Sequence, residues 1–229
     1  MKLGIMQPYF LPYIGYFQLI KAVDKYVIYD DVNFIKGGWI NRNRILLNGS
    51  AFMINVPMQG ASSSKKINEI EIGLNRDKIL LTIEQAYKRA PYYNLILPLI
   101  TDIVKFDNNN LALYIANSII KISKYFNLNT KILLSSGIEK NNELKAQEKV
   151  MSICKLLDTT EYYNAIGGQE LYDKSTFAKK NIELKFLETK NIEYKQFNNE
   201  FIPYLSILDV LMFNSVEEIN FLLDSYILV

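Results

Sequence analysis

The first thirty residues contain a strand, a turn, a helix and a second strand in close succession. Lys2–Met6 is a short apolar run typical of a buried strand, and Tyr26–Tyr29 (YVIY) is another. Two prolines mark a turn at Gln7–Pro12, and Tyr13–Val23 carries apolar residues at helical spacing. Two strands joined by a helix form a βαβ unit, which implies a parallel sheet.

The rest of the chain continues this alternation after a helical stretch. Further strands are expected at Ile45–Leu47, Phe52–Val56, Ile67–Ile72, Thr130–Leu134, Glu161–Asn164 and Ile182–Leu187. Helices are expected at Asp77–Lys88, Leu95–Val104, Leu111–Tyr125, Glu143–Leu157, Leu171–Lys179 and Val210–Leu223. Asn48–Ser50 (NGS) predicts a hairpin turn. We therefore expect an α/β protein with a Rossmann-like parallel sheet and a helical insertion in the middle of the chain. All of residues 1–229 form one domain in this interpretation, with an α/β core at about 1–75 and 128–229 and the insertion at about 76–127.

Composition favours a cytoplasmic, globular protein. Hydrophobic residues make up 49% of the 229 residues, yet no run reaches the roughly 18 to 20 apolar residues of a membrane span. We expect no signal peptide, because only a few apolar residues follow Lys2 before the turn. A single cysteine, Cys154, excludes an internal disulfide and is expected to be a buried thiol. The net charge of +2, without a block of like charge, argues against nucleic acid as a partner. Whether the chain forms a homo-oligomer stays open.

The chain contains no histidine. This excludes Ser-His-Asp and Cys-His catalytic machinery, and it leaves a poor ligand set for zinc. Proton transfer must then use a carboxylate, Tyr, Lys, water or the amine of the substrate itself. We assign no metal site, although Mg²⁺ held by carboxylates and phosphates is compatible with the sequence.

Ligands of parallel sheets bind beyond the carboxyl ends of the strands, which directs attention to the loops after the first two strands. The second loop holds six polar or aromatic residues within fifteen positions, namely Asp30, Asp31, Lys36, Trp39, Arg42 and Arg44. The two arginines could hold a phosphate or carboxylate, with Lys36 adding a charge and Trp39 stacking on a sugar or base. The alternative is a solvated loop whose arginines have no ligand.

The tetrapeptide Tyr13–Tyr16 (YIGY) lies where class I aminoacyl-tRNA synthetases carry their HIGH motif, at the start of the first helix. In those proteins the glycine allows a nucleotide to approach the backbone, and Gly15 fits that place. Tyr13 and Tyr16 replace both histidines. The alternative is that the two tyrosines are packing residues beside a helix start.

Two later strand ends carry further candidates. Gly167, Gly168 and Gln169 belong to Asn164–Gln169 (NAIGGQ), where paired glycines permit close approach of a ligand to the backbone. Ser135 and Ser136 follow another strand and could donate hydrogen bonds to a phosphate. Ordinary helix starts and caps explain both equally well.

The N-terminal segments MQPYFLPYIGYFQLI and DKYVIYDDVNFIKGGWINRNRI resemble the signature of the WbqC-like family. EQAYKRAPYY, SSGI, YNAIGGQELYD and PYLSILD fit the same pattern in order, so the resemblance spans nearly the whole chain. It implies a glycine or aminoacyl transferase of bacterial surface polysaccharide, notably O-antigen, that acts on a nucleotide- or lipid-linked amino sugar. Such a transferase would use an activated acyl donor or a nucleotide.

In this interpretation a carboxylate frees the attacking amine. We expect Asp31 to be the base, with Asp30 raising its pKa by repulsion and Tyr13 assisting. The expected substrate-binding residues are Gln7, Gly15, Tyr16, Lys36, Trp39, Arg42, Arg44, Ser135, Ser136, Gly167, Gly168 and Gln169. Two other functions stay open: an ATP-dependent ligase or nucleotidyltransferase that forms an adenylate, and a non-enzymatic carbohydrate-binding subunit.

Overall fold

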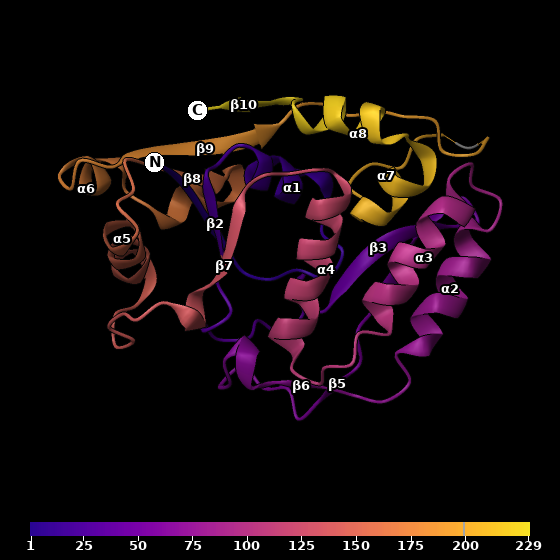
Figure 1. Ribbon diagram of the computed structural model, residues 1–229, viewed down its shortest axis with the longest axis horizontal. Helices are drawn as coiled ribbons and strands as arrows, with labels where there is room; N and C mark the ends of the chain where they lie inside the picture. Colours follow the sequence, from indigo (N-terminus) through magenta and orange to yellow (C-terminus); the bar gives the residue numbers. More distant parts are fainter. Residues whose placement is uncertain (199) are drawn as a thin grey trace.

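A six-stranded, mostly parallel sheet lies at the centre of the protein (Figure 1). The computed structural model describes residues 1–198 and 200–229. The strands are β1 (Lys2–Met6), β2 (Lys25–Ile28), β7 (Lys131–Leu134), β8 (Glu161–Ala165), β9 (Glu183–Thr189) and β10 (Tyr226–Leu228). β10 pairs antiparallel with β9, and the other five strands run parallel. The predicted α/β class with a parallel sheet is thus confirmed.

The strand order of the sheet is β10-β9-β8-β1-β2-β7. The chain therefore builds outward from β1 to β2 and β7, then crosses to the other side of β1 for β8 and β9. This is the strand order of doubly wound nucleotide-binding sheets, which bind ligands where the order reverses. The reversal here lies between β1 and β8, so their carboxyl ends mark the expected site.

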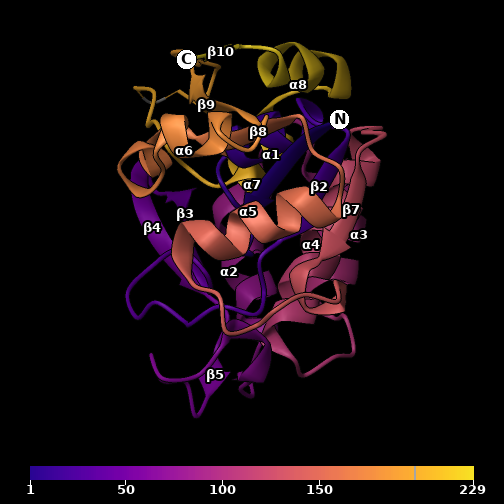
Figure 2. The ribbon, with the colours of Figure 1, turned by 90° about the vertical axis from the view of Figure 1, so that its left-hand side faces the viewer.

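Helices cover both faces of the sheet. On one face lie α1 (Ile14–Lys21), α4 (Leu111–Tyr125) and α8 (Val216–Leu223), and on the other lie α5 (Ala146–Leu156) and α6 (Lys174–Ala178) (Figures 1 and 2). The central strands β1 and β2 are buried: Leu3, Ile5 and Val27 pack with the residues of α5 and α6. Tyr26 joins the larger apolar cluster on the α1 side.

The chain between β2 and β7 leaves the central sheet. It forms the hairpin of β3 (Arg42–Leu47) and β4 (Ser50–Asn55), a short ladder of β5 (Met58–Gln59) and β6 (Glu71–Ile72), and the helices α2 (Asp77–Tyr87), α3 (Tyr93–Val104) and α4. The predicted hairpin and the three predicted helices are present. The strands β3–β6 belong to two separate two-stranded ladders and not to the central sheet. No helix of the described residues is long and apolar enough to cross a membrane.

The predicted strand at Ile67–Ile72 is wrong in its first half. Residues Ile67–Glu69 form a 3-10 turn, Ile70 is extended but unpaired with a strand, and Glu71–Ile72 form the short strand β6. The sequence INEIEI alternates, but Ile67 and Ile70 also lie three residues apart, and both are fully buried. The Glu69 carboxylate accepts a hydrogen bond from the Lys66 N–H, which favours the turn.

Two predicted helices are also divided. Instead of one helix over Val210–Leu223, α7 (Ile207–Phe213) and α8 are separate, since Ser215 begins α8 with a capping box. The helix predicted at Leu171–Lys179 is shortened to α6, which Asp173 caps. The preceding residues Ile166–Leu171 form a 3-10 turn that joins β8 to this segment.

Candidate ligand-binding site

A cavity of about 470 Å³ opens at the carboxyl ends of β1, β8 and β9, where the strand order reverses. Its walls come from the turn after β1, the start of α1, the hairpin strand β3 and the segment after β9. The lining residues are Met6, Tyr9, Pro12, Tyr13, Gly15, Tyr16, Trp39, Asn43, Arg44, Ala165, Ile166, Leu187, Glu188, Thr189 and Tyr204. The position agrees with the rule for parallel sheets, so this cavity is the candidate site.

Gly15 sets how closely α1 approaches the sheet. A Cβ atom at this position would lie 2.6 Å from the Thr189 Oγ1, so only glycine fits without a shift. The Thr189 hydroxyl donates a 2.7 Å hydrogen bond to Gln18 on the next turn of α1. Tyr13 precedes the helix without a side-chain capping bond, and the Tyr16 N–H donates a 3.0 Å hydrogen bond to the Tyr13 carbonyl. Among the described residues, the N–H groups of Ile14 and Gly15 have no such partner and can bind other acceptors.

Aromatic side chains dominate the lining. Tyr9 and Tyr16 lie 5.8 Å apart between ring centroids, and Tyr13 and Tyr204 lie 5.7 Å apart. Trp39 and Tyr204 are both substantially exposed at the cavity, with 43% and 65% of their surface accessible. Exposed rings of this kind provide faces on which a planar or sugar ring can stack.

Arg44 is the cation of this lining. Its guanidinium lies 5.5 Å from the centre of the Trp39 ring and donates a 3.3 Å hydrogen bond to the Tyr204 carbonyl. Its Nε atom is buried without a hydrogen-bond partner. Within residues 1–198 and 200–229, no acidic side chain pairs with Arg44. Arg44 is therefore available to an anionic ligand, and the carboxylate of the same lining is Glu188.

Burial raises the pKa values of Tyr13 and Tyr16, so both hydroxyls stay protonated near neutral pH. Burial, followed by the neighbouring Tyr204, raises the pKa of Tyr13 to about 12. Burial raises the pKa of Tyr16 further above its usual value, and its hydroxyl donates a 3.0 Å hydrogen bond to the Gln7 carbonyl. Tyr13 can therefore act as a hydrogen-bond donor, but it is a poor base.

The structure brings five predicted site residues together in the cavity, namely Tyr13, Gly15, Tyr16, Trp39 and Arg44. Gln7 follows the lining residue Met6, and Gly167, Gly168 and Gln169 follow Ile166 in the 3-10 turn. Lys36 is exposed and does not line the cavity. Arg42 donates hydrogen bonds to the Gly37 and Gly38 carbonyls, which organises its own loop.

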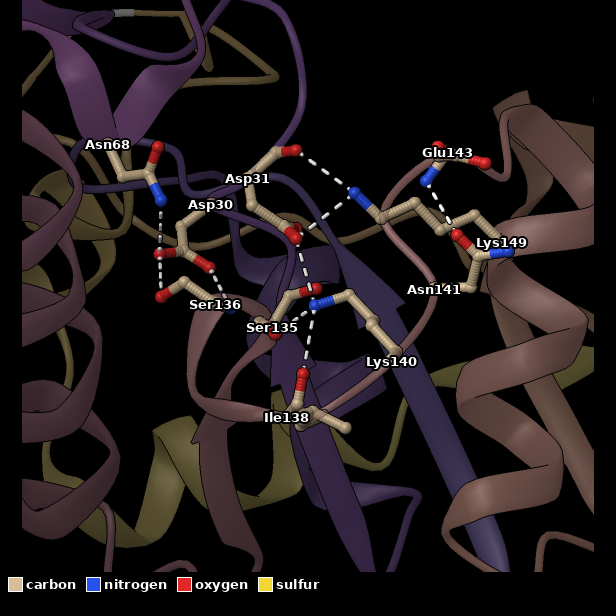
Figure 3. A network of polar contacts seen from close by, with 10 residues as sticks. All are labelled: Asp30, Asp31, Asn68, Ser135, Ser136, Ile138, Lys140, Asn141, Glu143 and Lys149. Carbon is tan, nitrogen blue, oxygen red and sulfur yellow. Dashed lines mark hydrogen bonds and ion pairs between the residues drawn. The ribbon is translucent and has the colours of Figure 1, made fainter.

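Asp31 lies in a buried ion cluster at the ends of β2 and β7, separate from the cavity lining (Figure 3). Its Oδ2 atom is 2.9 Å from Lys140 Nζ and 3.0 Å from Lys149 Nζ. Lys149 also donates a 3.1 Å hydrogen bond to the Asp31 carbonyl. Asp31, Arg42 and Gln7, which the sequence offered as site residues, are not among the residues that line this cavity.

The charge environment of Asp31 also differs from the prediction. Burial alone would raise the pKa of Asp31, but hydrogen bonds and charge from Lys140 and Lys149 outweigh burial and lower it. The expected rise caused by Asp30 is wrong, because Asp30 turns to other partners. Its carboxylate accepts hydrogen bonds from the Ser136 N–H at 2.9 Å and hydroxyl at 2.6 Å, and from Asn68 at 3.4 Å.

The two serines thus take part in the same cluster. The Ser135 carbonyl accepts a hydrogen bond from Lys140, while Ser136 binds Asp30. They lie in a 3-10 turn directly after β7, a strand that neighbours β2 and not β1, and neither serine lines the cavity. This network connects the ends of two strands to α5 and the segment before it.

Several cavity residues were absent from the sequence prediction. Glu188 and Thr189 end a strand whose carboxyl edge the same rule covers, so that rule could have found them. Asn43 lies between Arg42 and Arg44 in a loop that the rule selected, but it was not singled out there; Tyr204 comes from a segment without such a signal. The buried Asn43 amide donates a 2.8 Å hydrogen bond to the Leu11 carbonyl, which fixes the turn after β1.

The profile of the WbqC-like protein family matches residues 7–221, a range that includes every lining residue except Met6. The uncharacterized protein Rv1507c of Mycobacterium tuberculosis is 29% identical over 215 residues, which cover 92% of each chain. No solved structure matches the chain.

Proposed function

We propose, from the fact that this chain belongs to the WbqC-like protein family, that it is a transferase acting on an amino sugar. It adds glycine or another small acyl or aminoacyl group to the amine of a nucleotide- or lipid-linked sugar in surface polysaccharide synthesis, including O-antigen. The observation that carries this proposal is Arg44, a cation without an acidic partner in the described residues, beside exposed rings in a cavity at the strand reversal.

The arrangement supports an anionic ligand with a ring system. Arg44 and the N–H groups of Ile14 and Gly15 at the start of α1 are suited to a phosphate, because the guanidinium carries a positive charge and the helix start a partial one. Trp39 and Tyr204 offer faces for a base or sugar ring. A cavity of about 470 Å³ is within the usual size range of small-molecule sites.

The transfer needs few protein groups. The sugar amine attacks the carbonyl carbon of the activated acyl group, the new C–N bond forms, and the bond to the leaving group breaks. Glu188 or water takes the proton that the amine loses, and the leaving group departs with its electron pair. Tyr13 and backbone N–H groups donate hydrogen bonds to the carbonyl oxygen as it gains charge. The protein thus acts chiefly by placing two substrates together.

Mass spectrometry of defined mixtures tests the proposal. The purified protein is incubated with UDP-linked and dTDP-linked amino sugars and with glycyl donors activated as a thioester or an adenylate. The expected result is a glycyl-sugar amide, and the matched sugars with a hydroxyl in place of the amine stay unchanged. Product formed only from free glycine and ATP would assign the ligase function instead. Binding of the sugar without any product under all these conditions would overturn the transferase proposal in favour of a carbohydrate-binding subunit.

A further inference from the structure

Residues 190–198 and 200–206 belong to a strap that joins β9 to α7 and carries Tyr204 to the cavity. The described residues of the strap contain no helix or strand. Tyr204 lies near its end with a φ of 58°, a left-handed conformation that is costly for tyrosine. Such a conformation persists only where the surrounding contacts hold it in place.

The end of the strap is fixed to both sides of the cavity. The Ser206 N–H donates a 2.8 Å hydrogen bond to the Arg44 carbonyl, and its hydroxyl donates one of 2.7 Å to the Leu11 carbonyl. The Ile207 N–H donates a 2.8 Å bond to the Pro12 carbonyl. These bonds hold the residues that follow Tyr204. The part of the strap that precedes Tyr204 is held by other contacts.

The anchor of that part is Asp209, a fully buried carboxylate in the first turn of α7. It accepts hydrogen bonds from the Tyr194 hydroxyl at 2.8 Å and from the Gln196 amide at 2.6 Å, both in the strap. The Tyr87 hydroxyl of α2 donates a third bond of 2.8 Å. All three partners donate hydrogen bonds. All three bonds can therefore form only if both oxygens of the Asp209 carboxylate act as acceptors.

Gln196 connects Asp209 to the part of the strap that lies just before Tyr204. Its amide oxygen accepts a 2.8 Å hydrogen bond from the Ile202 N–H, and its amide nitrogen donates one of 3.1 Å to the Ile202 carbonyl. The same nitrogen donates to Asp209. Only one orientation of the amide makes all three bonds, and Ile202 is two residues before Tyr204.

We infer that Asp209 is a positioning residue for the ligand site: through Tyr194 and Gln196 it holds the strap so that Tyr204 faces Tyr13 across the cavity. The Tyr87 hydroxyl also accepts a hydrogen bond from the Leu46 N–H in β3, two residues after Arg44. Asp209 thereby joins the two segments that supply Arg44 and Tyr204. The inference rests on the proposed function only in treating this cavity as the ligand site.

Hydrogen exchange tests the mechanical part without any ligand. In Asp209→Asn one accepting oxygen becomes a donor facing Tyr194 and Gln196, so the Gln196 amide must turn or lose its bond. The Ile202 amide should then exchange at least about tenfold faster, as expected for loss of a local hydrogen bond. Tyr194→Phe, which removes one bond from the strap, should act in the same direction. Tyr114→Phe removes a buried hydroxyl bond to the Val104 carbonyl away from the lining, and it should leave Ile202 protected.

A second experiment measures the binding of UDP to the cavity. The fluorescence emission of Trp39, the single tryptophan of the chain, reports the binding. Asp209→Asn and Tyr194→Phe should raise the Kd for UDP by about tenfold, the scale of one hydrogen bond, while Tyr114→Phe should stay near wild type.

Unchanged Ile202 exchange in a folded Asp209→Asn variant, or equal effects of Tyr194→Phe and Tyr114→Phe, would overturn the inference. If Asp209→Asn does not fold, Tyr194→Phe against Tyr114→Phe decides. Absence of UDP binding in the wild type would count against the proposed function, and the hydrogen-exchange experiment would still test Asp209.

Discussion

Arg44 and Trp39 lie together at the mouth of the cavity, with the guanidinium 5.5 Å from the centre of the indole ring. A cation held against an aromatic face is weakly hydrated, and it keeps its in-plane N–H groups for a ligand. Because the described residues provide no acidic partner for Arg44, the pair forms a ready site for a ring-bearing anion.

Arg44→Ala should weaken binding of a nucleotide-linked sugar by about 1.5–3 kcal/mol, the scale of hydrogen bonds to a charged group. Lys36→Ala is the matched control, since it removes the same charge from the same loop, and Lys36 is exposed and does not line the cavity. Isothermal calorimetry measures both. Equal losses in the two variants would mean that general surface charge, and not Arg44, attracts the ligand.

Asp31→Asn should destabilise the protein by about 3–5 kcal/mol, because it leaves Lys140 and Lys149 buried without their counter-charge. Urea unfolding at neutral pH measures the loss. A variant of wild-type stability with strongly reduced transfer activity would instead restore Asp31 as the catalytic base.

The same residue predicts a pH dependence. The pKa of Asp31 is lower in the folded protein than its ordinary value of 3.8, so its ionised form contributes stability above that value. The contribution disappears as the pH falls through the folded pKa. The difference in unfolding free energy between wild type and Asp31→Asn should therefore be constant near neutral pH and should narrow below 3.8. A difference that widens on acidification would contradict the ion cluster.

Gly15→Ala should cost about 1–3 kcal/mol, as overpacking does, because the new Cβ meets the Thr189 hydroxyl at 2.6 Å. If that contact is the cause, Gly15→Ala combined with Thr189→Ala should cost less than the sum of the single variants. Thermal unfolding of all four proteins gives this coupling. Strict additivity, together with lost nucleotide binding in Gly15→Ala alone, would favour the comparison with the HIGH motif.

Tyr13 should behave as a neutral donor over a wide pH range. Its pKa of about 12 places its ionisation well above the ordinary tyrosine value of about 10. The ratio of ligand affinities of wild type and Tyr13→Phe should therefore stay constant up to about pH 10. An inflection of that ratio near neutral pH would show that Tyr13 titrates there and serves as a base.

Local patterns predicted most of the helices and the parallel strands, because each of those elements has its own apolar periodicity. The segment that contains Ile67 and Ile70 fits both an alternating strand pattern and the three-residue spacing of a 3-10 turn. The strand pattern was chosen, and so the 3-10 turn was missed. The site was predicted in part, since loops after β1 and β2 belong to the correct edge of the sheet. The division of that edge into a cavity with Arg44 and an ion cluster with Asp31 depends on which strands are neighbours, and no local pattern contains that information.

Tyr204 shows a second limit of sequence reasoning. Its ring lies 5.7 Å from that of Tyr13, and the Ser206 hydroxyl nearby donates a hydrogen bond to the Leu11 carbonyl. Both contacts join residues nearly two hundred positions apart in the chain. Motif spacing and periodicity do not report such contacts.

The central claim is that the cavity at the ends of β1, β8 and β9 binds the substrate. A titration of the wild type with a nucleotide-linked amino sugar, followed by the emission of Trp39, tests it most directly, since the chain has no other tryptophan. We predict a saturable change whose midpoint matches the Kd from calorimetry and shifts to higher concentration in Arg44→Ala. Binding by calorimetry that leaves the emission of Trp39 unchanged and is unaffected by Arg44→Ala would place the substrate elsewhere and contradict the account.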